Sequence, residues 1–315
     1  MTGWGRGPVG VALTALLAAA ALTGARSEAP PAPMVHVADG ALQGARQGGA
    51  DAYLGIPFAA PPVGELRWHA PLPAKAWSGA HDATHFGASC WQAVSAKGFG
   101  PWTHEYVVDG PVSEDCLYLN VWTPARSGAG RPVLVWFHGG GFSQGSGSVP
   151  IYDGAHLAAQ GVVVVTVNYR LGVLGFFAHP ELTREASGGA TGNYGLMDMI
   201  AALKWVRANA AAFGGDPGAV TIAGQSAGGM AVHDLIVSPL AKGLFQRAVI
   251  ESGLPGVAPN QPLADAEAAG VAFAKAHGAA DLAALRAMSP AQLSQGARGS
   301  FAPMRDGVLL PADDL

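Results

Sequence analysis

Ser226 is the side chain whose sequence context best suits a nucleophile. It is the centre of Gly224-Gln225-Ser226-Ala227-Gly228, and a G-x-S-x-G segment between a strand and a helix forms a sharp turn that exposes the serine Oγ above a sheet. Residues 219–223 read as a buried strand, and an apolar, helix-like stretch follows until Pro239. A serine in an ordinary glycine-rich turn is the alternative, but the strand before and the helix after favour the nucleophile.

A second glycine-rich turn, His138-Gly139-Gly140-Gly141, directly follows the apolar run at residues 133–137. Glycines allow unusual backbone dihedral angles and close approach, so the N–H groups of such a turn can point into a site. Together with the N–H of Ala227 they would form an oxyanion hole, in which one donor contributes about 3 kcal/mol to stabilising the transition state. The alternative is a flexible turn, because Gly and Ser continue through residues 145–148.

The elements that must position these turns alternate along the chain. Continuous apolar runs at residues 133–137, 162–167 and, more briefly, 248–250 predict strands that are covered on both faces. Between them, apolar residues at helical spacing predict a helix that Asn193 would cap and residues 214–217 would end. An Ala-rich helical pattern covers residues 263–293. Strands alternating with helices predict one α/β domain with a mostly parallel sheet flanked by helices.

Composition narrows the class of protein and its compartment. The 315 residues are 50% hydrophobic and 13% charged, with a net charge of −4 and no basic cluster, which argues against a nucleic-acid partner. Residues 1–25 have the pattern of a signal peptide, with Arg6 before an apolar run and small residues at 23–25. A membrane anchor is the alternative, but the apolar run is short for a span. We therefore expect a secreted or periplasmic protein with its domain at residues 26–315.

Cys90 and Cys116 are the two cysteines of the chain. In an exported protein an even pair favours a disulfide, which for a loop of this length would contribute roughly 3 kcal/mol. Two separate buried thiols are the alternative. The intervening segment carries several aromatic residues, which would either rim a substrate pocket or pack on the surface: Trp91, Phe99, Trp102 and Tyr106.

Taken together, these motifs resemble the type B carboxylesterase (carboxylesterase/cholinesterase) family of the α/β-hydrolase fold. The resemblance covers roughly residues 35–315 and rests on several stretches in family order. They are Gly55-Ile56-Pro57-Phe58-Ala59, Ser113-Glu114-Asp115-Cys116-Leu117, His138-Gly139-Gly140-Gly141-Phe142, Asn168-Tyr169-Arg170-Leu171-Gly172, Gly192-Asn193-Tyr194-Gly195, Phe213-Gly214-Gly215-Asp216-Pro217 and the Ser226 pentapeptide.

The resemblance implies a role for each matched residue. Ser226 would be the nucleophile, and Gly140, Gly141 and Ala227 would donate the oxyanion hydrogen bonds. Cys90 and Cys116 match the N-terminal disulfide of the family. By similarity, Glu114 would pair with Arg67 and Asp198 with Arg170, so these charges would be structural. The implied reaction is hydrolysis of a small-molecule carboxylic ester without a cofactor.

The chain departs from the family pattern after Ser226. A nucleophilic serine needs a general base and an orienting carboxylate, which in α/β-hydrolases follow in the order Ser, Asp or Glu, His. The residues at 306–311 resemble the family segment just before the one that carries the acid. We therefore expect no catalytic acid or histidine of the family type within this chain, and a fold that lacks the C-terminal strands and helices.

Local residues are poor substitutes for the missing pair. His233 lies about two turns into the expected helix, His277-Gly278 reads as a helix end, and Asp306-Gly307 reads as a turn. Glu251 closes an expected strand. His81 and His85 have helical spacing, but no third ligand accompanies them, so no metal site is predicted.

Three functions remain open at this stage. The first is a serine ester hydrolase acting through a Ser226 acyl-enzyme, with doubtful activity for the 315 residues alone. The second is a catalytically impaired, truncated esterase with an exposed apolar sheet edge. The third is a non-enzymatic binding member of the same fold, for which a nucleophile elbow and an HGGG turn are unnecessary. Gln225 is neutral where cholinesterases carry an acid, which argues against a cationic choline ester. The sequence does not determine the oligomeric state.

Overall fold

The computed structural model describes residues 1–4, 31–94, 103–126, 128–253, 260–297 and 301–313. The chain divides into two units, Met1–Pro31 and Ala32–Leu315, and the architecture below is that of the second. The predicted signal peptide falls almost entirely outside the described residues, so signal peptide, export and cleavage stay predictions. In the described ranges, no helix combines the length and the apolar character needed to cross a membrane.

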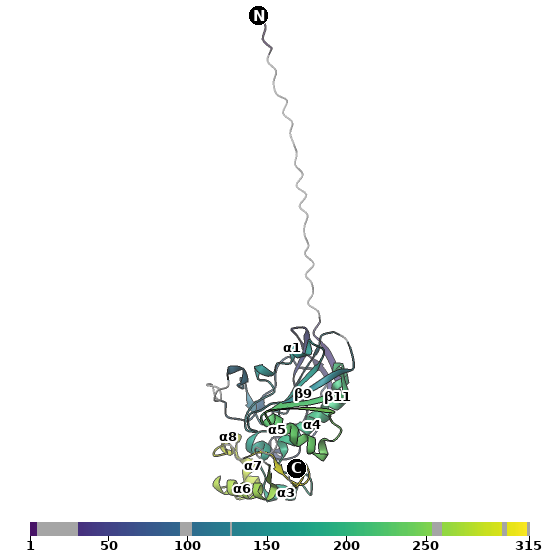
Figure 1. Ribbon diagram of the computed structural model, residues 1–315. Helices are drawn as coiled ribbons and strands as arrows, with labels where there is room; N and C mark the ends of the chain where they lie inside the picture. The colour runs from purple at the N-terminus through teal and green to yellow at the C-terminus, as the bar shows by residue number, and fades with distance from the viewer. Residues whose placement is uncertain (5–30, 95–102, 127, 254–259, 298–300, 314–315) are drawn as a thin grey trace. The chain divides into compact units, whose positions relative to one another are not determined.

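A seven-stranded sheet forms the centre of this unit (Figure 1). The strands run across the sheet in the order β12 (Arg247–Glu251), β11 (Gly215–Gln225), β9 (Arg131–Phe137), β10 (Val163–Val167), β8 (Tyr118–Pro124), β4 (Ala50–Pro57) and β3 (Ala45–Gln47). The apolar runs that predicted strands became β9, β10 and β12.

The sheet is mixed, and its two halves differ in direction. From β12 through β11 and β9 to β10 the pairings are parallel, whereas β8, β4 and β3 pair antiparallel. The expected parallel arrangement therefore holds for the half that carries the Ser226 turn. Parallel strands present their carboxyl ends at one edge, and the register places Phe137 of β9 beside Gly224 of β11.

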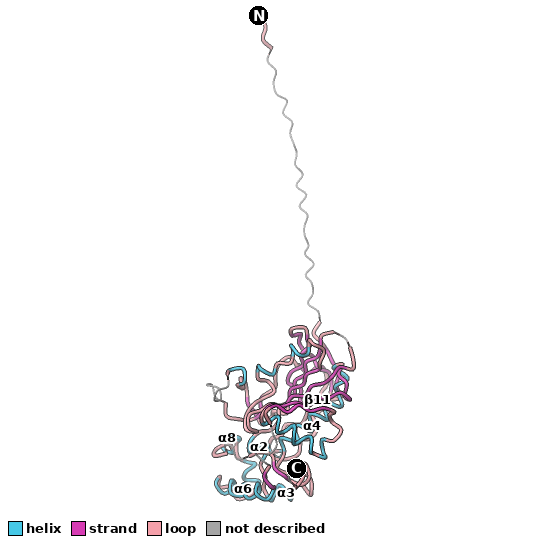
Figure 2. The backbone as a smooth tube through the Cα atoms, viewed as in Figure 1, coloured by secondary structure: helices cyan, strands magenta, loops and turns pink. Residues whose placement is uncertain are grey.

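Helices cover both faces of the sheet, as Figure 2 shows in cyan and magenta. The large hydrophobic core includes residues of α4 (Tyr194–Asn209) and α5 (Ala227–Val237), and a smaller one lies under α1 (Ala155–Ala158). Strand β10 shows the reason, because successive side chains of a strand point to opposite faces. Val163 and Val165 belong to the large core and Val164 to the small one.

The remaining elements surround this centre. Helices α3 (Pro180–Glu185), α6 (Leu263–Ala276), α7 (Leu282–Ala287) and α8 (Pro290–Leu293) lie together at one end of the unit (Figure 1). Of these, α6, α7 and α8 confirm the helical pattern expected at residues 263–293. The other elements are α2 (Gly172–Phe176), β1 (Met34–Val37), β2 (Gly40–Gln43), β5 (Ala80–Asp82), β6 (Ser89–Cys90), β7 (Val112–Ser113), β13 (Gln261–Pro262) and β14 (Met304–Arg305), with 3-10 turns at Gly64–Leu66, His104–Tyr106, Pro150–Tyr152, Ala210–Phe213 and Pro239–Ala241.

Asn193 immediately precedes α4, as predicted, but its side chain does not cap the helix. The carboxamide instead bonds to both backbone polar groups of Met304: Nδ2 donates to the carbonyl at 2.7 Å, and Oδ1 accepts from the N–H at 2.9 Å. The start of α4 is thereby tied to β14, more than a hundred residues later. The expectation of a side-chain cap was wrong because a long-range partner takes both polar atoms.

Strand β12 is exposed, although its apolar sequence suggested a covered strand. It forms one edge of the sheet, and Val249 and Ile250 retain 43% and 36% of their accessible surface. Nothing among the described residues covers this edge. The apolar side chains therefore lie on an open strand, in line with the exposed edge considered from the sequence.

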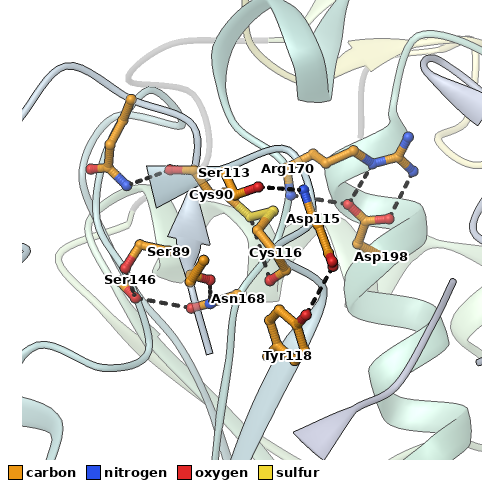
Figure 3. Close-up of a disulfide and its surroundings, with 12 residues drawn as sticks. Ser89, Cys90, Ser113, Asp115, Cys116, Tyr118, Ser146, Asn168, Arg170 and Asp198 are labelled. Atoms are coloured by element: carbon orange, nitrogen blue, oxygen red, sulfur yellow. Dashed lines mark hydrogen bonds and ion pairs between the residues drawn. A yellow bond between two sulfur atoms is a disulfide. The ribbon is translucent and has the colours of Figure 1, made fainter. Parts of the chain in front are cut away.

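The paired cysteines and charges lie where the family resemblance implied (Figure 3). Cys90 and Cys116 form a disulfide. Arg170 donates two hydrogen bonds of 2.8 Å to Asp198, and both side chains are buried. Arg67 likewise donates two hydrogen bonds of 2.6 Å, one to each carboxylate oxygen of Glu114. Breaking a buried pair leaves one charge without a partner, so these residues support the fold and lie outside the candidate site.

Candidate active site

Ser226 lies at a strained turn between β11 and α5. Its backbone has φ 56° and ψ −123°, a combination that costs a non-glycine residue on the order of 1–3 kcal/mol. Its N–H donates to the Glu251 carbonyl oxygen at 2.8 Å, which fixes the turn to β12. A Cβ on Gly224 would lie 2.5 Å from the Gly228 backbone, and one on Gly228 would lie 2.1 Å from the Phe137 oxygen. The two glycines of the pentapeptide are thus required by close packing.

The HGGG turn lies beside Ser226 because β9 and β11 end together. We call residues 139–145 the oxyanion loop, after the role that the family resemblance predicts for them. A Cβ on Gly139 would lie 3.3 Å from the Ser226 Cβ, and Gly140 and Gly141 have φ values of +115° and +63°. Among the described residues, no acceptor takes a hydrogen bond from the N–H of Gly140, Gly141 or Ala227. The three amides are free to bind an oxygen atom of a ligand.

His138 packs against this loop and does not line the cavity. Its ring stacks on Tyr169 with centroids 4.3 Å apart, and its Nδ1 lies 2.8 Å from the Gly139 carbonyl oxygen. The Tyr169 hydroxyl donates to the His138 carbonyl at 2.7 Å. Burial lowers the pKa of His138 to about 4, so the imidazole is neutral near pH 7. His138 therefore acts as a neutral, packed support.

A cavity of about 380 Å³ opens over Ser226 and the oxyanion loop. This volume lies in the range of small-molecule sites. Among the residues that the structure describes, the side chains lining the cavity carry no formal charge: Gln92, Ala93, Val94, Tyr106, Val107, Val108, Ser143, Gln144, Val149, Tyr152, Gln225 and Ser226. The cavity suits a neutral, partly apolar molecule.

Most of these lining residues are not predicted by the sequence motifs. Of the four aromatic residues expected either to rim a pocket or to pack on the surface, Tyr106 lines the cavity, whereas the Trp91 indole donates to Ser294 Oγ at 3.0 Å and packs against the core. Phe99 and Trp102 lie outside the described residues. No sequence motif marks Tyr152 or Gln92 as part of the lining, although Gln92 could have been found from its position two residues after Cys90.

The structure brings none of the alternative acid and base residues into the cavity lining. The Nδ1 atom of His233 lies 3.8 Å from the neighbouring Asp234. His277 ends α6, with Nδ1 2.9 Å from the Phe273 carbonyl oxygen. Asp306 accepts three backbone N–H groups in the expected turn, and Glu251 ends β12 with an exposed side chain. Within the described residues, no three His, Cys, Asp or Glu side chains cluster as metal ligands.

The fold and the strained serine turn define the α/β-hydrolase class, and comparison with known proteins narrows it. A para-nitrobenzyl esterase structure superposes with a TM-score of 0.80 and 40% identity over 88% of this chain and 58% of that chain. The sequence model of the carboxylesterase family matches residues 31–314. The chain belongs to the carboxylesterase family.

Relatives in this family carry the names of several esterases. The chain is 45% identical over 292 residues to fumonisin B1 esterase of Sphingopyxis macrogoltabida, a match of 92% of this chain and 51% of that protein. It is 46% identical to para-nitrobenzyl esterase of Bacillus subtilis over 73% of this chain and 45% of that protein. For human cocaine esterase the identity is 48%, over 66% and 37%. The chain spans about half the length of the curated relatives it matches.

Proposed function

We propose that this chain belongs to a serine carboxylic ester hydrolase that acts through an acyl-enzyme on Ser226. The Ser226 Oγ would attack the ester carbonyl carbon, and the oxygen of that carbonyl would become an oxyanion held by the N–H groups of Gly140, Gly141 and Ala227. Collapse would expel the alcohol, and water would then cleave the acyl-serine bond. The observation that carries the proposal is the strained Ser226 turn, with three unengaged amides beside it at the floor of a cavity.

The general base and its carboxylate are proposed to come from the part of the family domain that lies beyond this span. His138 is buried and bonded to Gly139, and neither His233 nor His277 lines the cavity. Without a base, a preorganised oxyanion hole and substrate binding still accelerate hydrolysis, by roughly 10³–10⁴ over water where this has been measured. We therefore expect the 315 residues alone to retain weak activity, which Ser226→Ala would lower little because a serine without its base adds little to the rate.

The proposed substrate is an uncharged carboxylic ester with an apolar acyl or alcohol group. Valines and two tyrosines form much of the cavity wall, and among the described residues no charged side chain lines it to pair with an ionic group. Gln225, next to the nucleophile, is neutral as well. A cationic choline ester would therefore find no anionic partner among the described lining residues, and only the rings of Tyr106 and Tyr152 could face its charge.

Hydrolysis of p-nitrophenyl butyrate tests the proposal. The chain should release p-nitrophenol faster than buffer does but at least about 10³-fold more slowly than para-nitrobenzyl esterase. A chain that is folded by circular dichroism and no faster than buffer would argue for the non-enzymatic alternative. A rate matching that of the full-length esterase would show that a base lies within these residues.

A further inference from the structure

We propose that Gln92 is a positioning residue that holds the oxyanion loop in its catalytic geometry. The inference rests on the function proposed above for Ser226, and it assigns the buried carboxamide of Gln92 a specific task. Gln92 retains 7% of its accessible surface and also lines the cavity. A side-chain amide this deeply buried is expected to have hydrogen-bond partners for its polar atoms.

The Gln92 carboxamide binds both backbone polar groups of one loop residue. The Gly145 N–H donates to Oε1 at 2.7 Å, and Nε2 donates to the Gly145 carbonyl oxygen at 2.8 Å. Nε2 also donates to the Cys90 carbonyl oxygen at 2.9 Å. Both amide hydrogens and the oxygen of the side chain are therefore engaged, which fixes its orientation as well as its place.

Gly145 in turn determines where the other end of the oxyanion loop lies. A Cβ on Gly145 would lie 2.5 Å from the Gly139 carbonyl oxygen, so the two ends of the loop are in close contact. The Gln144 N–H donates to the Gly140 carbonyl oxygen at 3.2 Å, and a Cβ on Gly140 would lie 2.1 Å from the Gln144 oxygen. A displacement of Gly145 would thus be passed to Gly140, whose N–H is one of the proposed donors.

The other end of the Gln92 link is rigid. Cys90 lies on β6 and is joined to Cys116 by the disulfide. Next to it, Ser89 Oγ donates to Ser146 Oγ at 2.9 Å, and Ser146 Oγ donates to Asn168 at 3.0 Å (Figure 3). The serine contacts hold the residue that follows the oxyanion loop, while Gln92 holds the loop itself.

This arrangement affects catalysis because oxyanion donors act only when they are already aimed at the developing charge. The loop is rich in glycine and has little intrinsic stiffness. Loss of the Gln92 tether should let the Gly140 and Gly141 amides sample orientations away from the cavity. Since substrate binding does not need these amides, the chemical step should slow while KM changes little.

Two alanine variants separate positioning from stability. Gln92→Ala removes the tether, whereas Asn209→Ala removes another buried carboxamide that bridges two backbone groups. Asn209 Oδ1 accepts from Ala38 at 2.9 Å, and its Nδ2 donates to Trp205 at 3.0 Å, outside the cavity lining. Both variants should lower the melting temperature by a similar amount, because each loses comparable hydrogen bonds.

The readout is the hydrolysis, above the buffer rate, of p-nitrophenyl butyrate and of its thiono analogue, in which sulfur replaces the carbonyl oxygen. We expect Gln92→Ala to lower kcat for the oxygen ester about 10-fold to 100-fold with KM within about 2-fold, since one oxyanion donor accounts for 10²–10³ in kcat. The thiono ester binds the hole poorly and should lose less than about 3-fold. Asn209→Ala should leave kcat for both esters within about 2-fold.

A conservative variant adds a pH signature. In Gln92→Glu the new carboxylate can accept from the Gly145 N–H but repels the Gly145 carbonyl oxygen. Protonation restores one donor. The ratio of the variant's rate to that of the unmodified chain should therefore rise several-fold as the pH is lowered from 8 to 5, whereas the ratio for Gln92→Ala should stay flat.

A failure of this proposal can be told apart from a failure of the proposed function. If the folded, unmodified chain does not exceed the buffer rate, the expected residual activity fails, and amide hydrogen exchange decides on Gln92. Exchange in the peptide covering residues 139–147 should accelerate at least about 10-fold in Gln92→Ala and not in Asn209→Ala. Unchanged exchange there, or equal loss of kcat for oxygen and thiono esters, would overturn the positioning role.

Discussion

At the residue scale, two residues lower the stability of the folded chain. Ser226 occupies a strained backbone conformation that α5, β12 and two tightly packed glycines maintain. Asp234, on the same helix, is a second costly residue: its Oδ1 accepts from Asn260 at 2.9 Å, while its buried Oδ2 has no partner among the described residues. Burial raises the pKa of Asp234 to about 7.

Asp234→Asn should therefore stabilise the chain above neutral pH. The pKa of this carboxyl is higher in the folded state than its unfolded value of 3.8, so the folded chain binds more protons between pH 3.8 and about 7 and loses stability as the pH rises through that window. The free energy of unfolding of Asp234→Asn, relative to the unmodified chain, should increase by up to about 4 kcal/mol between pH 4 and pH 8.

Urea unfolding at the two pH values measures this difference. The exposed Asp265, in the first turn of α6, provides the matched control, since Asp265→Asn removes a carboxylate that is in contact with water. A gap that stays constant with pH would mean that Asp234 is ionised in the folded chain at little cost.

At the element scale, the apolar runs predicted the strands, and the two glycine-rich motifs predicted which strand ends meet. Parallel strands end at a common edge, and the HGGG turn and the Ser226 turn are neighbours because β9 and β11 also pair directly in the sheet. The exposure of β12 could not be read from its composition, because a run such as residues 248–250 looks the same whether or not a further strand covers it. The roles of Asn193 and Gln92 depend on partners distant in the chain, which local patterns do not encode.

Substitution on β12 should show whether its open edge governs solubility. An exposed apolar edge strand offers unpaired backbone groups for association between chains, and a lysine opposes this. Val249→Lys should raise the concentration at which light scattering detects aggregates. Val271→Lys is the control, since Val271 is similarly exposed, at 47%, but lies on helix α6. Equal gains from both variants would attribute the effect to net charge rather than to the strand edge.

At the scale of the whole molecule, the chain supplies one part of the machinery of its family. It holds the strained Ser226 turn beside the HGGG turn and a cavity with no charged side chain among its described lining residues, on a core that superposes on para-nitrobenzyl esterase. That esterase is longer, and this chain covers 58% of it. The family resemblance predicted both the fold and this partial coverage. Ser226 is therefore expected to react much faster when a general base is placed beside it.

Fluorophosphonate labelling of Ser226, located by peptide mass spectrometry, tests this claim most directly. Two chains are compared: the 315 residues, and the same residues extended at Leu315 by the portion of para-nitrobenzyl esterase that follows the matched region. Each is paired with its Ser226→Ala variant and shown to be folded by circular dichroism. We expect rapid, stoichiometric labelling of Ser226 in the extended chain and labelling at least about 10³-fold slower in the 315 residues. A folded extended chain that stays unlabelled at Ser226, or equal labelling rates for the two chains, would contradict it.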